Sequence, residues 1–384
     1  MTGGRAAAAR FPADLLREQV RRILAAWGMP EDLAETTVTA MVDTDLAGID
    51  SHGIQMLTAY ESLLHRGHLR PAARPEVLRE TPVSALVDGR GGLGHPAAAM
   101  GMQRAVDKAR EVGVGLVAVR NSHHFGAAGH YAATAAEQGM IGLVATTTRT
   151  TVMVPTRGTL PRLGTNPLAF AAPTGPGRPP FLLDMSTTTV AVNKVKVYDL
   201  NNRPLPPGWV LDGDGHPLTD AAAALRQIDD ALGGLTALGG GPGRAGHKGY
   251  GLGVLVQILA GTLTGSSFGP LRDAADGRAD IGHFFMAFDP GLFRDGDEFE
   301  RDLDAMIHVL HETPPSDPDL PVLVAGGPEA TSRAGRTRTG IPVPQTLIEK
   351  LRGVCERSDV PLLLDPSAAL PADGVGEPGS GAPP

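Results

Sequence analysis

Histidines stand at two places in the sequence where an imidazole could do acid–base chemistry. His52 follows a predicted helix and precedes Gly53, which permits a tight turn. His123 and His124 stand at the end of a predicted strand, just before a predicted helix. Reversible oxidation of an alcohol to a carbonyl needs a group that exchanges a proton near neutral pH, and imidazole suits that task. Taken singly, each of these histidines fits a structural, hydrogen-bonded role equally well.

The residues around His52 do not indicate a hydrolase. Asp50, Ser51 and His52 are consecutive, and neighbours in sequence cannot normally hold the geometry of nucleophile, base and orienting acid. The residues around Ser51 also do not match the G-x-S-x-G elbow of the α/β-hydrolases. We therefore expect no Ser-His-Asp triad.

A metal site is a weaker alternative for the remaining histidines. His123, His124 and His130 could supply three nitrogen ligands, but their spacing matches no recognised ligand pattern. His308 and His311 are three residues apart on a predicted helix and are expected on its solvated surface. We expect no metal.

Two glycine patterns resemble a loop that binds phosphate. Gly89–Gly94 matches G-x-G-x-x-G between a predicted strand and a predicted helix, which is the context of a pyrophosphate loop. That loop is normally followed by an acidic residue at the end of the next strand, but here the strand leads into 120–122, Arg-Asn-Ser. Gly241–Gly246 is a second match with no convincing strand before it. Because the chain has 50 glycines, chance matches are expected, and we predict plain turns at both places.

Apolar periodicity predicts the elements that position these groups. Two helices are expected over 13–46, separated at 28–30, and another over 54–64. From about residue 80 strands and helices alternate, and the sequence beyond Asp365, rich in Pro and Gly, is expected to be disordered. The predicted strands are 84–87, 115–119, 141–145, 168–171, 180–183, 280–288 and 321–325; the predicted helices are 96–111, 127–138, 250–262, 297–312 and 344–357.

Bulk composition excludes several classes of protein. The 384 residues are 42% hydrophobic and 20% charged, which is typical of a globular chain long enough for two domains. A formal charge of −8 argues against binding nucleic acid. The single cysteine, Cys355, excludes an internal disulfide framework and fits a reducing cytoplasm. No segment has the ~20 apolar residues of a membrane span. We expect a cytoplasmic protein that binds neither nucleic acid nor membrane.

Seven short segments, each weak alone, occur in a specific order between about residues 12 and 355. They are 45–53, 121–129, 163–170, 184–187, 246–252, 282–290, and 326–330 with 340–342. Together they resemble the malate/L-sulfolactate (type 2 malate/lactate) dehydrogenase family. That family also includes ureidoglycolate dehydrogenase, diketogulonate reductase and piperideine-2-carboxylate reductase.

The resemblance implies an α/β fold that composition alone does not indicate. It implies a non-Rossmann NAD(P)-binding domain with a mixed sheet, beside a helix-rich domain. We expect 76–244 to bind NAD or NADP, 1–75 and 245–365 to form the helix-rich domain, and 366–384 to be a disordered tail. The resemblance also implies a homodimer.

The resemblance assigns roles to residues at matching positions. His52 and His124 match the family's proton-transfer histidines, and which of them transfers the proton stays open. A lysine at a cofactor position can supply a point charge, although a solvated lysine at a helix start is the alternative. The implied cofactor residues are Thr148, Asp184, Met185, Ser186, Lys248, Gly327, Pro328 and Glu329, the last three in a turn; the substrate residues are Arg149, Thr165 and Asn166.

Three positions depart from the family pattern. Ala47 and Met56 stand where many members have arginines that help to hold the substrate carboxylate. Either Arg149 or Arg162 substitutes for them, or the substrate is neither malate nor lactate. His123 stands where Asn is common, which places two imidazoles side by side.

These observations favour hydride transfer between NAD or NADP and a small 2-hydroxy or 2-oxo acid. The second hypothesis is a cyclic ketimine reductase, which would act on a C=N bond beside a carboxylate. A third, of another class, is an inactive cofactor-binding scaffold. The joint presence of His52, His124, Asp184 and Lys248 argues against the third.

Overall fold

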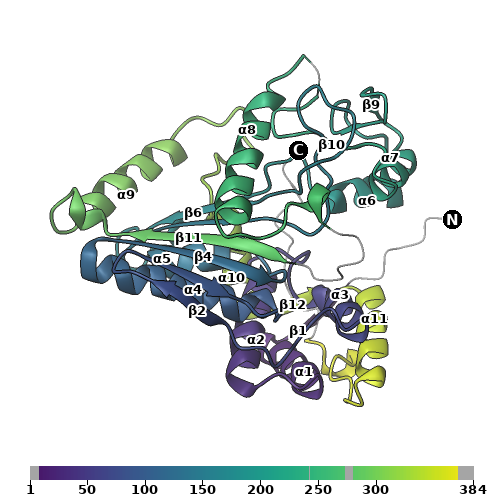
Figure 1. Cartoon of the computed structure of the whole chain (residues 1–384), viewed down its shortest axis with the longest axis horizontal. Helices are drawn as coiled ribbons and strands as arrows, with labels where there is room; N and C mark the ends of the chain where they lie inside the picture. Colours follow the sequence, from purple (N-terminus) through teal and green to yellow (C-terminus); the bar gives the residue numbers. More distant parts are fainter. Residues whose placement is uncertain (1–7, 242, 273–279, 371–384) are drawn as a thin grey trace. The chain divides into compact units, whose positions relative to one another are not determined.

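The computed structural model describes residues 8–241, 243–272 and 280–370 (Figure 1). Contacts along the chain divide it into two compact units. Unit 1 comprises 1–61 and 329–384, and unit 2 comprises 62–328. Within the described ranges, no helix combines the length and apolar character needed to cross a membrane.

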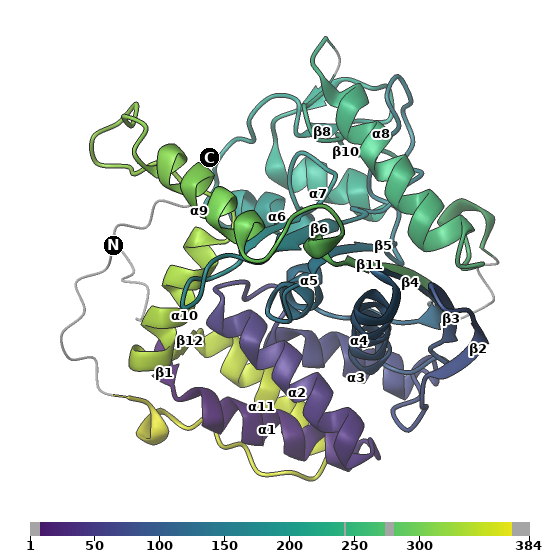
Figure 2. The ribbon, with the colours of Figure 1, turned by 90° about the vertical axis from the view of Figure 1, so that its left-hand side faces the viewer.

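Unit 1 is built on helices that lie side by side in Figure 2. The helix α1 buries Leu16, Val20 and Ile23 along one face, as the apolar spacing predicts. Gln19, also buried on α1, hydrogen-bonds the Cys355 sulfur on α11 and so ties the two ends of the chain together. The elements are β1 (Ala9–Phe11), α1 (Ala13–Ala26), α2 (Glu31–Leu46), a 3-10 turn (Ile54–Met56), α10 (Gly327–Thr339), β12 (Ile341–Val343) and α11 (Gln345–Arg357), with β1 and β12 antiparallel.

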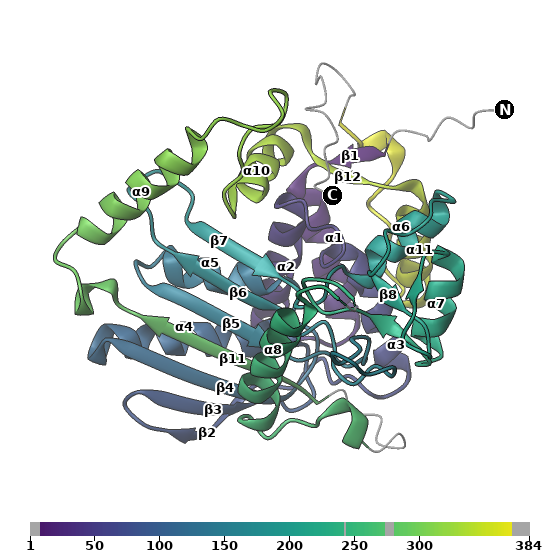
Figure 3. The ribbon, with the colours of Figure 1, turned by 90° about the horizontal axis from the view of Figure 1, so that it is seen from above.

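Unit 2 contains a seven-stranded mixed sheet, whose strands lie next to one another in Figure 3. The one parallel pair is β3 with β4, and every other neighbouring pair in this sheet is antiparallel. A Rossmann sheet is mostly parallel, so the predicted non-Rossmann α/β fold is confirmed. In spatial order the strands are β2 (Glu76–Glu80), β3 (Ser84–Asp88), β4 (Val114–Ser122), β11 (Ile281–Phe288), β5 (Ile141–Thr146), β6 (Leu168–Ala172) and β7 (Phe181–Met185).

Helices cover both faces of this sheet. On one face lie α4 (Gly94–Val112) and α5 (Ala128–Ala136), and on the other lies α8 (Gly246–Gln257), continued by a π-helical turn (Ile258–Thr262) (Figure 1). Small residues let α4 approach closely: a Cβ at Gly101 would lie 2.7 Å from the Phe285 ring. This tight packing fixes the end of β4, from which the loop with His123 and His124 begins.

A second, smaller hydrophobic core lies in unit 2, outside the large sheet. Val195, Leu205 and Leu235 are buried in it, between short strands and two helices. The elements outside the large sheet are α3 (Leu57–His65), α6 (Val192–Leu200), β8 (Val210–Leu211), β9 (Pro217–Leu218), α7 (Ala221–Asp229), β10 (Gly234–Leu235) and α9 (Glu298–His311), with 3-10 turns at Gly269–Leu271, Pro290–Leu292 and Pro366–Ala368.

The compact units divide the chain at other places than the expected boundary at residue 245, since β11 lies between β4 and β5 in the middle of the sheet. Which residues form the NAD(P)-binding domain stays a prediction. Residues 321–325, predicted as a strand, form none. The start of the expected disordered tail is ordered, since Leu370 donates a backbone hydrogen bond to the Arg10 carbonyl; 371–384 lie outside the described residues.

Candidate active site

The loop between β4 and α5 presents His124 in a defined orientation. The backbone N–H of Gly126 donates to Nδ1 of His124 over 3.3 Å. Gly126 has φ of +82°, a conformation that a residue with a side chain rarely adopts. Because Nδ1 accepts this hydrogen bond, the neutral ring carries its proton on Nε2. His124 can therefore donate a hydrogen bond from Nε2 to an oxygen or nitrogen of a ligand.

A buried hydrogen-bonded chain across three strands supports the same loop. In β11, His283 lies with Nδ1 2.7 Å from the Thr146 hydroxyl and Nε2 3.0 Å from the Ser122 hydroxyl. The ring of Phe125 stacks on His283, with centroids 4.5 Å apart and an interplanar angle of 4°. Burial lowers the pKa of His283 to about 3, so its ring is neutral. Sequence analysis missed this role, for which the signal was a polar residue inside an apolar strand.

His123 lies beside His124 in sequence but is a neutral group. Burial is the main cause that lowers the pKa of His123 to about 4; a hydrogen bond to the His68 backbone opposes the shift, and the positive charge of Arg149 adds to it. Two adjacent imidazoles therefore do not mean two adjacent charges at neutral pH. Like the Asn common in the family, His123 supplies a neutral polar side chain.

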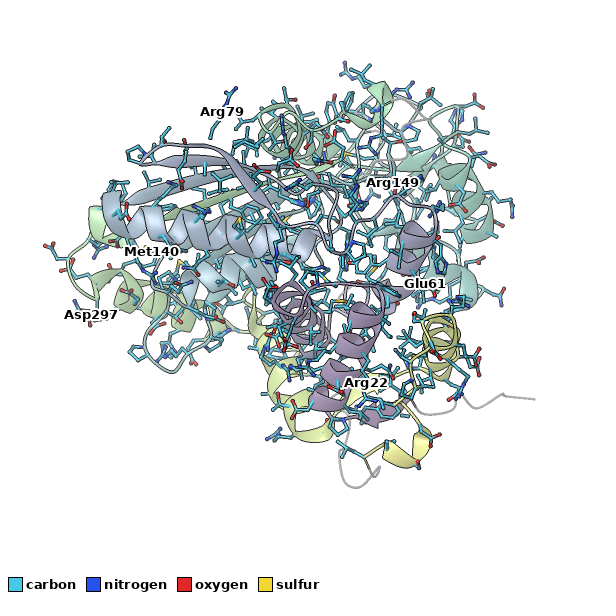
Figure 4. All side chains as sticks on the ribbon, turned by 60° about the horizontal axis from the view of Figure 1, so that its bottom comes forward. Arg22, Glu61, Arg79, Met140, Arg149 and Asp297 are labelled. Atoms are coloured by element: carbon cyan, nitrogen blue, oxygen red, sulfur yellow. The ribbon has the colours of Figure 1, made fainter. Side chains whose placement is uncertain are left out.

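Arg149, labelled in Figure 4, is an exposed residue on the loop after β5. Its charge lowers the pKa of His123, so the guanidinium acts electrostatically on the loop that carries His123 and His124. Arg162, the other arginine considered as a carboxylate clamp, is also exposed and donates to the Pro161 carbonyl. Of the two, Arg149 is the one whose charge acts on the pKa of His123.

Three of the predicted site residues meet around Gly164. A Cβ at Gly164 would lie 1.7 Å from the Thr148 hydroxyl and 3.0 Å from Oδ1 of Asn166. The hydroxyl of Thr187 donates to the Thr165 carbonyl over 3.0 Å and to the Asn166 carbonyl over 3.1 Å. The segments around residues 148, 165 and 187 are therefore held together by the fold.

Asn166 offers a buried acceptor at this place. Its side-chain amide donates to the Gly253 carbonyl over 2.9 Å, and the residue is fully buried. Within the described residues its Oδ1 has no hydrogen-bond partner. A buried acceptor without a donor costs free energy, and the carboxamide N–H of a nicotinamide would satisfy it. The residues present therefore fit the cofactor that the family resemblance implies.

The remaining predicted cofactor residues of unit 2 stand at element ends. Asp184, at the end of β7, accepts a hydrogen bond from the backbone N–H of Gly129 over 2.7 Å, and Met185 and Ser186 follow it. Lys248 is exposed on the first turn of α8.

The predicted turn at residues 327–329 is the first turn of helix α10 instead. Gly327 and Pro328 belong to unit 2, and Glu329 belongs to unit 1. In unit 2, the backbone N–H of Leu182 on β7 donates to the Ala325 carbonyl over 3.3 Å, so α10 begins beside the strand that carries Asp184. In this turn the Gly327 N–H donates to the Val324 carbonyl over 3.0 Å, and Pro328 has no N–H to offer an anion.

His52, in unit 1, lies in the loop between α2 and the 3-10 turn. The Ser51 hydroxyl lies 2.7 Å from Nδ1 of His52, and burial lowers the pKa of the ring. Asp50 forms a bidentate ion pair with Arg336 on α10. Its carboxylate therefore binds Arg336, whereas the acid of a triad would have to bind the histidine. Met56 is half-buried in the 3-10 turn.

Asp45 is a buried carboxylate that holds the turn after His52. It accepts the backbone N–H of Ile54 over 2.9 Å, and a Cβ at Gly53 would lie 1.8 Å from its Oδ1. Burial raises the pKa of Asp45 to about 8, although the hydrogen bond from Ile54 acts in the opposite direction. The sequence signal for this residue was an acid on the buried face of α2.

We predict that Asp45→Asn stabilises the protein increasingly as pH rises. The raised pKa means that the folded state binds the Asp45 proton more tightly than the unfolded state, so this residue lowers stability as pH rises from about 3.8 to about 8. Asn keeps an acceptor for Ile54 and does not titrate. The Tm of the variant minus that of the wild type should grow across this range by a few degrees. A difference that is independent of pH would contradict a raised pKa at Asp45.

A cavity of about 800 Å³ lies elsewhere in unit 2. Arg157, Arg244 and His247 line it, together with the second glycine pattern. None of the predicted site residues lines it, although His247 precedes Lys248.

Potential metal ligands converge at a different place. Within the described ranges, Asp212, Asp214 and His216 have ligand atoms within 4.8 Å of one another. Two of these residues are exposed, and Asp212 accepts backbone N–H groups of the other two, as in an ordinary turn. His123, His124 and His130 form no such group there.

Comparison with known proteins shows similarity along almost the whole chain. Residues 11–352 match the malate/L-lactate dehydrogenase family. A malate dehydrogenase of Pyrococcus abyssi is 36% identical over 356 residues, which cover 91% of this chain and 95% of that protein. A Delta(1)-pyrroline-2-carboxylate reductase of Ancylobacter novellus is 30% identical over 342 residues, covering 88% of this chain and 95% of that protein. The crystal structure of malate dehydrogenase from Entamoeba histolytica matches with a TM-score of 0.88 at 30% identity, covering 92% of this chain and 99% of that one. The resemblance indicated by the seven segments is confirmed.

Proposed function

The chain belongs to the malate/L-lactate dehydrogenase family, and we propose that it transfers a hydride between NAD or NADP and a small 2-hydroxy or 2-oxo acid. It is an enzyme, an oxidoreductase acting on CH–OH groups, as its relatives are. The observation that carries the finer proposal is the fixed orientation of His124, with Nδ1 occupied by Gly126.

The two histidines have different roles in this proposal. In the neutral His124 ring, Nε2 bears a proton and has no lone pair to accept another, so His124 donates a hydrogen bond to the substrate carbonyl oxygen. His52 transfers the proton. Its Nδ1–H can donate to the Ser51 hydroxyl, which leaves the Nε2 lone pair to accept a proton from the substrate hydroxyl. In the reducing direction the protonated His52 returns that proton to the oxygen.

The bound nicotinamide supplies or accepts the hydride, and residues of this chain hold it. The resemblance made Asn166 a substrate residue; here we assign it instead to the nicotinamide carboxamide, because its buried Oδ1 lacks a donor among the described residues. The family resemblance supports Gly327, Pro328 and Glu329, in the first turn of α10, as further cofactor contacts. The other cofactor contacts in this proposal are Thr148, Asp184, Met185, Ser186 and Lys248.

Substrate recognition in this proposal depends on Arg149, with Thr165 beside the carboxamide site. Arginine forms bidentate, charge-assisted bonds to carboxylates, and the exposed Arg149 lies within electrostatic reach of the histidine loop. Many family members have an arginine where this chain has Met56, and the methionine makes that position apolar. That substitution favours the second candidate, a cyclic ketimine reductase, because a hydrocarbon ring would suit this side chain.

We predict that Met56→Arg raises activity on malate or lactate and lowers it on the native compound. A charge-assisted pair is worth roughly 1.5–3 kcal/mol, which corresponds to about 10–150-fold in binding. The measurement is kcat/KM for each substrate, with Met56→Lys as a control that adds charge without the bidentate geometry. Efficient malate turnover by the unmodified enzyme, unchanged by Met56→Arg, would instead show that Arg149 already holds the carboxylate.

The activity itself is tested by following nicotinamide absorbance with a panel of 2-oxo acids and cyclic imines, using NAD(H) and NADP(H) separately. We also propose a cytoplasmic homodimer that binds neither nucleic acid nor membrane. The formal charge of −8 supports the absence of nucleic-acid binding, and light scattering would test the dimer.

A further inference from the structure

The Gly89–Gly94 loop, whose pattern suggests phosphate binding, directs its backbone N–H groups at its own chain. The N–H of Gly89 donates to the Arg120 carbonyl and that of Gly91 to the Asn121 carbonyl, each over 2.8 Å. The N–H of Gly94 donates to the His124 carbonyl over 3.1 Å. An N–H group that is satisfied inside the protein is not free to bind a phosphate. The loop thus holds the segment that leads from β4 to His124.

The glycines are required by how closely this segment approaches. A Cβ at Gly94 would lie 2.2 Å from the His123 carbonyl oxygen and 2.7 Å from the His124 carbonyl oxygen. A Cβ at Gly89 would lie 3.0 Å from the Asn121 carbonyl oxygen. Because these neighbours are backbone atoms, they cannot rotate out of the way as a side chain could. Any residue with a side chain at 94 must displace the backbone that carries His124.

The Asp88 carboxylate also connects the Gly89–Gly94 loop to the segment that leads to His124. Oδ1 of Asp88 accepts the N–H of Arg90 over 2.7 Å and the side-chain amide of Asn121 over 2.8 Å. Asn121 itself has φ of +50°, a conformation that needs support from its surroundings. Asp88 therefore joins the glycine loop to the first residue of the histidine segment.

We propose that the Gly89–Gly94 loop, and Gly94 above all, positions His124 for its hydrogen bond to the substrate. The inference rests on the role proposed for His124 in the preceding subsection. Gly94 acts through the His124 backbone and does not itself touch the substrate. Displacing that backbone also disturbs the bond from the Gly126 N–H to Nδ1, and with it the proton on Nε2 that His124 donates.

The test compares Gly94→Ala with Gly335→Ala, a matched change on α10 where a new Cβ meets nothing within 4 Å. For Gly94→Ala we expect kcat to fall roughly 100-fold, the effect of a misplacement of about 1 Å, with the Kd for reduced dinucleotide unchanged. Gly335→Ala should match the wild type in both quantities.

A second readout follows the ring without turnover. In protein labelled with ¹⁵N-histidine, the Nδ1 and Nε2 chemical shifts of the His124 ring report which nitrogen is protonated, and the spectrum of His124→Gln identifies these signals. We expect the Nε2–H form in the wild type and in Gly335→Ala, and a mixture of tautomers in Gly94→Ala.

If Gly94→Ala does not fold, the Asp88 variants decide. Asp88→Ala removes the acceptor for Arg90 and Asn121, and kcat should fall by about 10-fold, whereas Asp88→Asn keeps one acceptor oxygen and should restore most of that loss. Normal kcat and tautomer in Gly94→Ala, or equal kcat in the two Asp88 variants, would overturn the positioning role. Normal kcat in His124→Ala would instead overturn the role of His124 in the proposed function.

Discussion

His52→Ala should lower kcat by ~10²–10⁴-fold, which is the usual contribution of a positioned proton-transfer group. The side chain belongs to the loop after α2 and to neither helix, so we expect the fold and the Kd for the dinucleotide to change little. Added imidazole should restore part of the lost rate in the oxidising direction, since the deleted group is the base.

The pH dependence provides a sharper form of the same prediction. Burial lowers the pKa of His52 below its ordinary value of 6.5, so the neutral, base form persists to more acidic pH than in a free imidazole. The rate of alcohol oxidation should therefore fall only at pH values below about 6.5, and this acidic limb should be absent in His52→Ala. His124→Ala serves as the comparison: its kcat falls as well, but imidazole does not restore it. Rescue of His124→Ala and not of His52→Ala would reverse the two roles.

Gly53→Ala should be strongly destabilising and nearly inactive, because the new methyl group would lie 1.8 Å from Oδ1 of Asp45. The nearest atoms to that position all belong to the Asp45 side chain. The turn after His52 must then move or the buried carboxylate must lose its hydrogen bond from Ile54. Strain of this kind at a packed position costs typically 1–3 kcal/mol, or a Tm lower by several degrees.

A double mutant distinguishes steric overlap with Asp45 from the other effects of replacing Gly53. Asp45→Ala removes the atoms that Gly53→Ala would meet, so Asp45→Ala/Gly53→Ala should be more stable than Gly53→Ala alone. The coupling energy, obtained from urea unfolding of the four proteins, should be 1 kcal/mol or more, roughly the scale measured for residues in direct contact. Additive effects would contradict the close approach of Asp45 to Gly53.

The parts of the fold that were predictable are those set by local pattern. The helices α1 and α2 and the strands β3, β4 and β5 follow from apolar spacing and from turn residues between them. The position of β11 could not be predicted in this way, because its partners β4 and β5 lie more than a hundred residues earlier in the chain. The helix α10 was missed for a different reason: it buries no residue, so no apolar stripe reveals it.

The candidate site shows the same division. The sequence singled out His52 and His124, since histidines beside glycines in loops are visible as a local pattern. The supports of these histidines come from distant segments: His283 stacks on Phe125, and Gly94, at the start of the preceding helix α4, contacts the His124 carbonyl. Such contacts depend on tertiary structure and leave no trace in residue spacing. For the same reason, residue spacing did not reveal that N–H groups of the Gly89–Gly94 pattern donate to backbone carbonyls of this chain.

The central claim is hydride transfer from a nicotinamide to a carbon beside a carboxylate, and isotope transfer tests it most directly. Reduced dinucleotide carrying deuterium at C4 would be incubated with the enzyme and a panel of 2-oxo acids and cyclic imines, and the products examined by mass spectrometry and NMR. We predict deuterium at C2 of a 2-hydroxy acid, or at C2 of a cyclic amino acid for the second candidate, and far slower incorporation with His52→Ala. No transfer to any substrate from either NADH or NADPH, by folded protein that binds the dinucleotide, would contradict the proposed function.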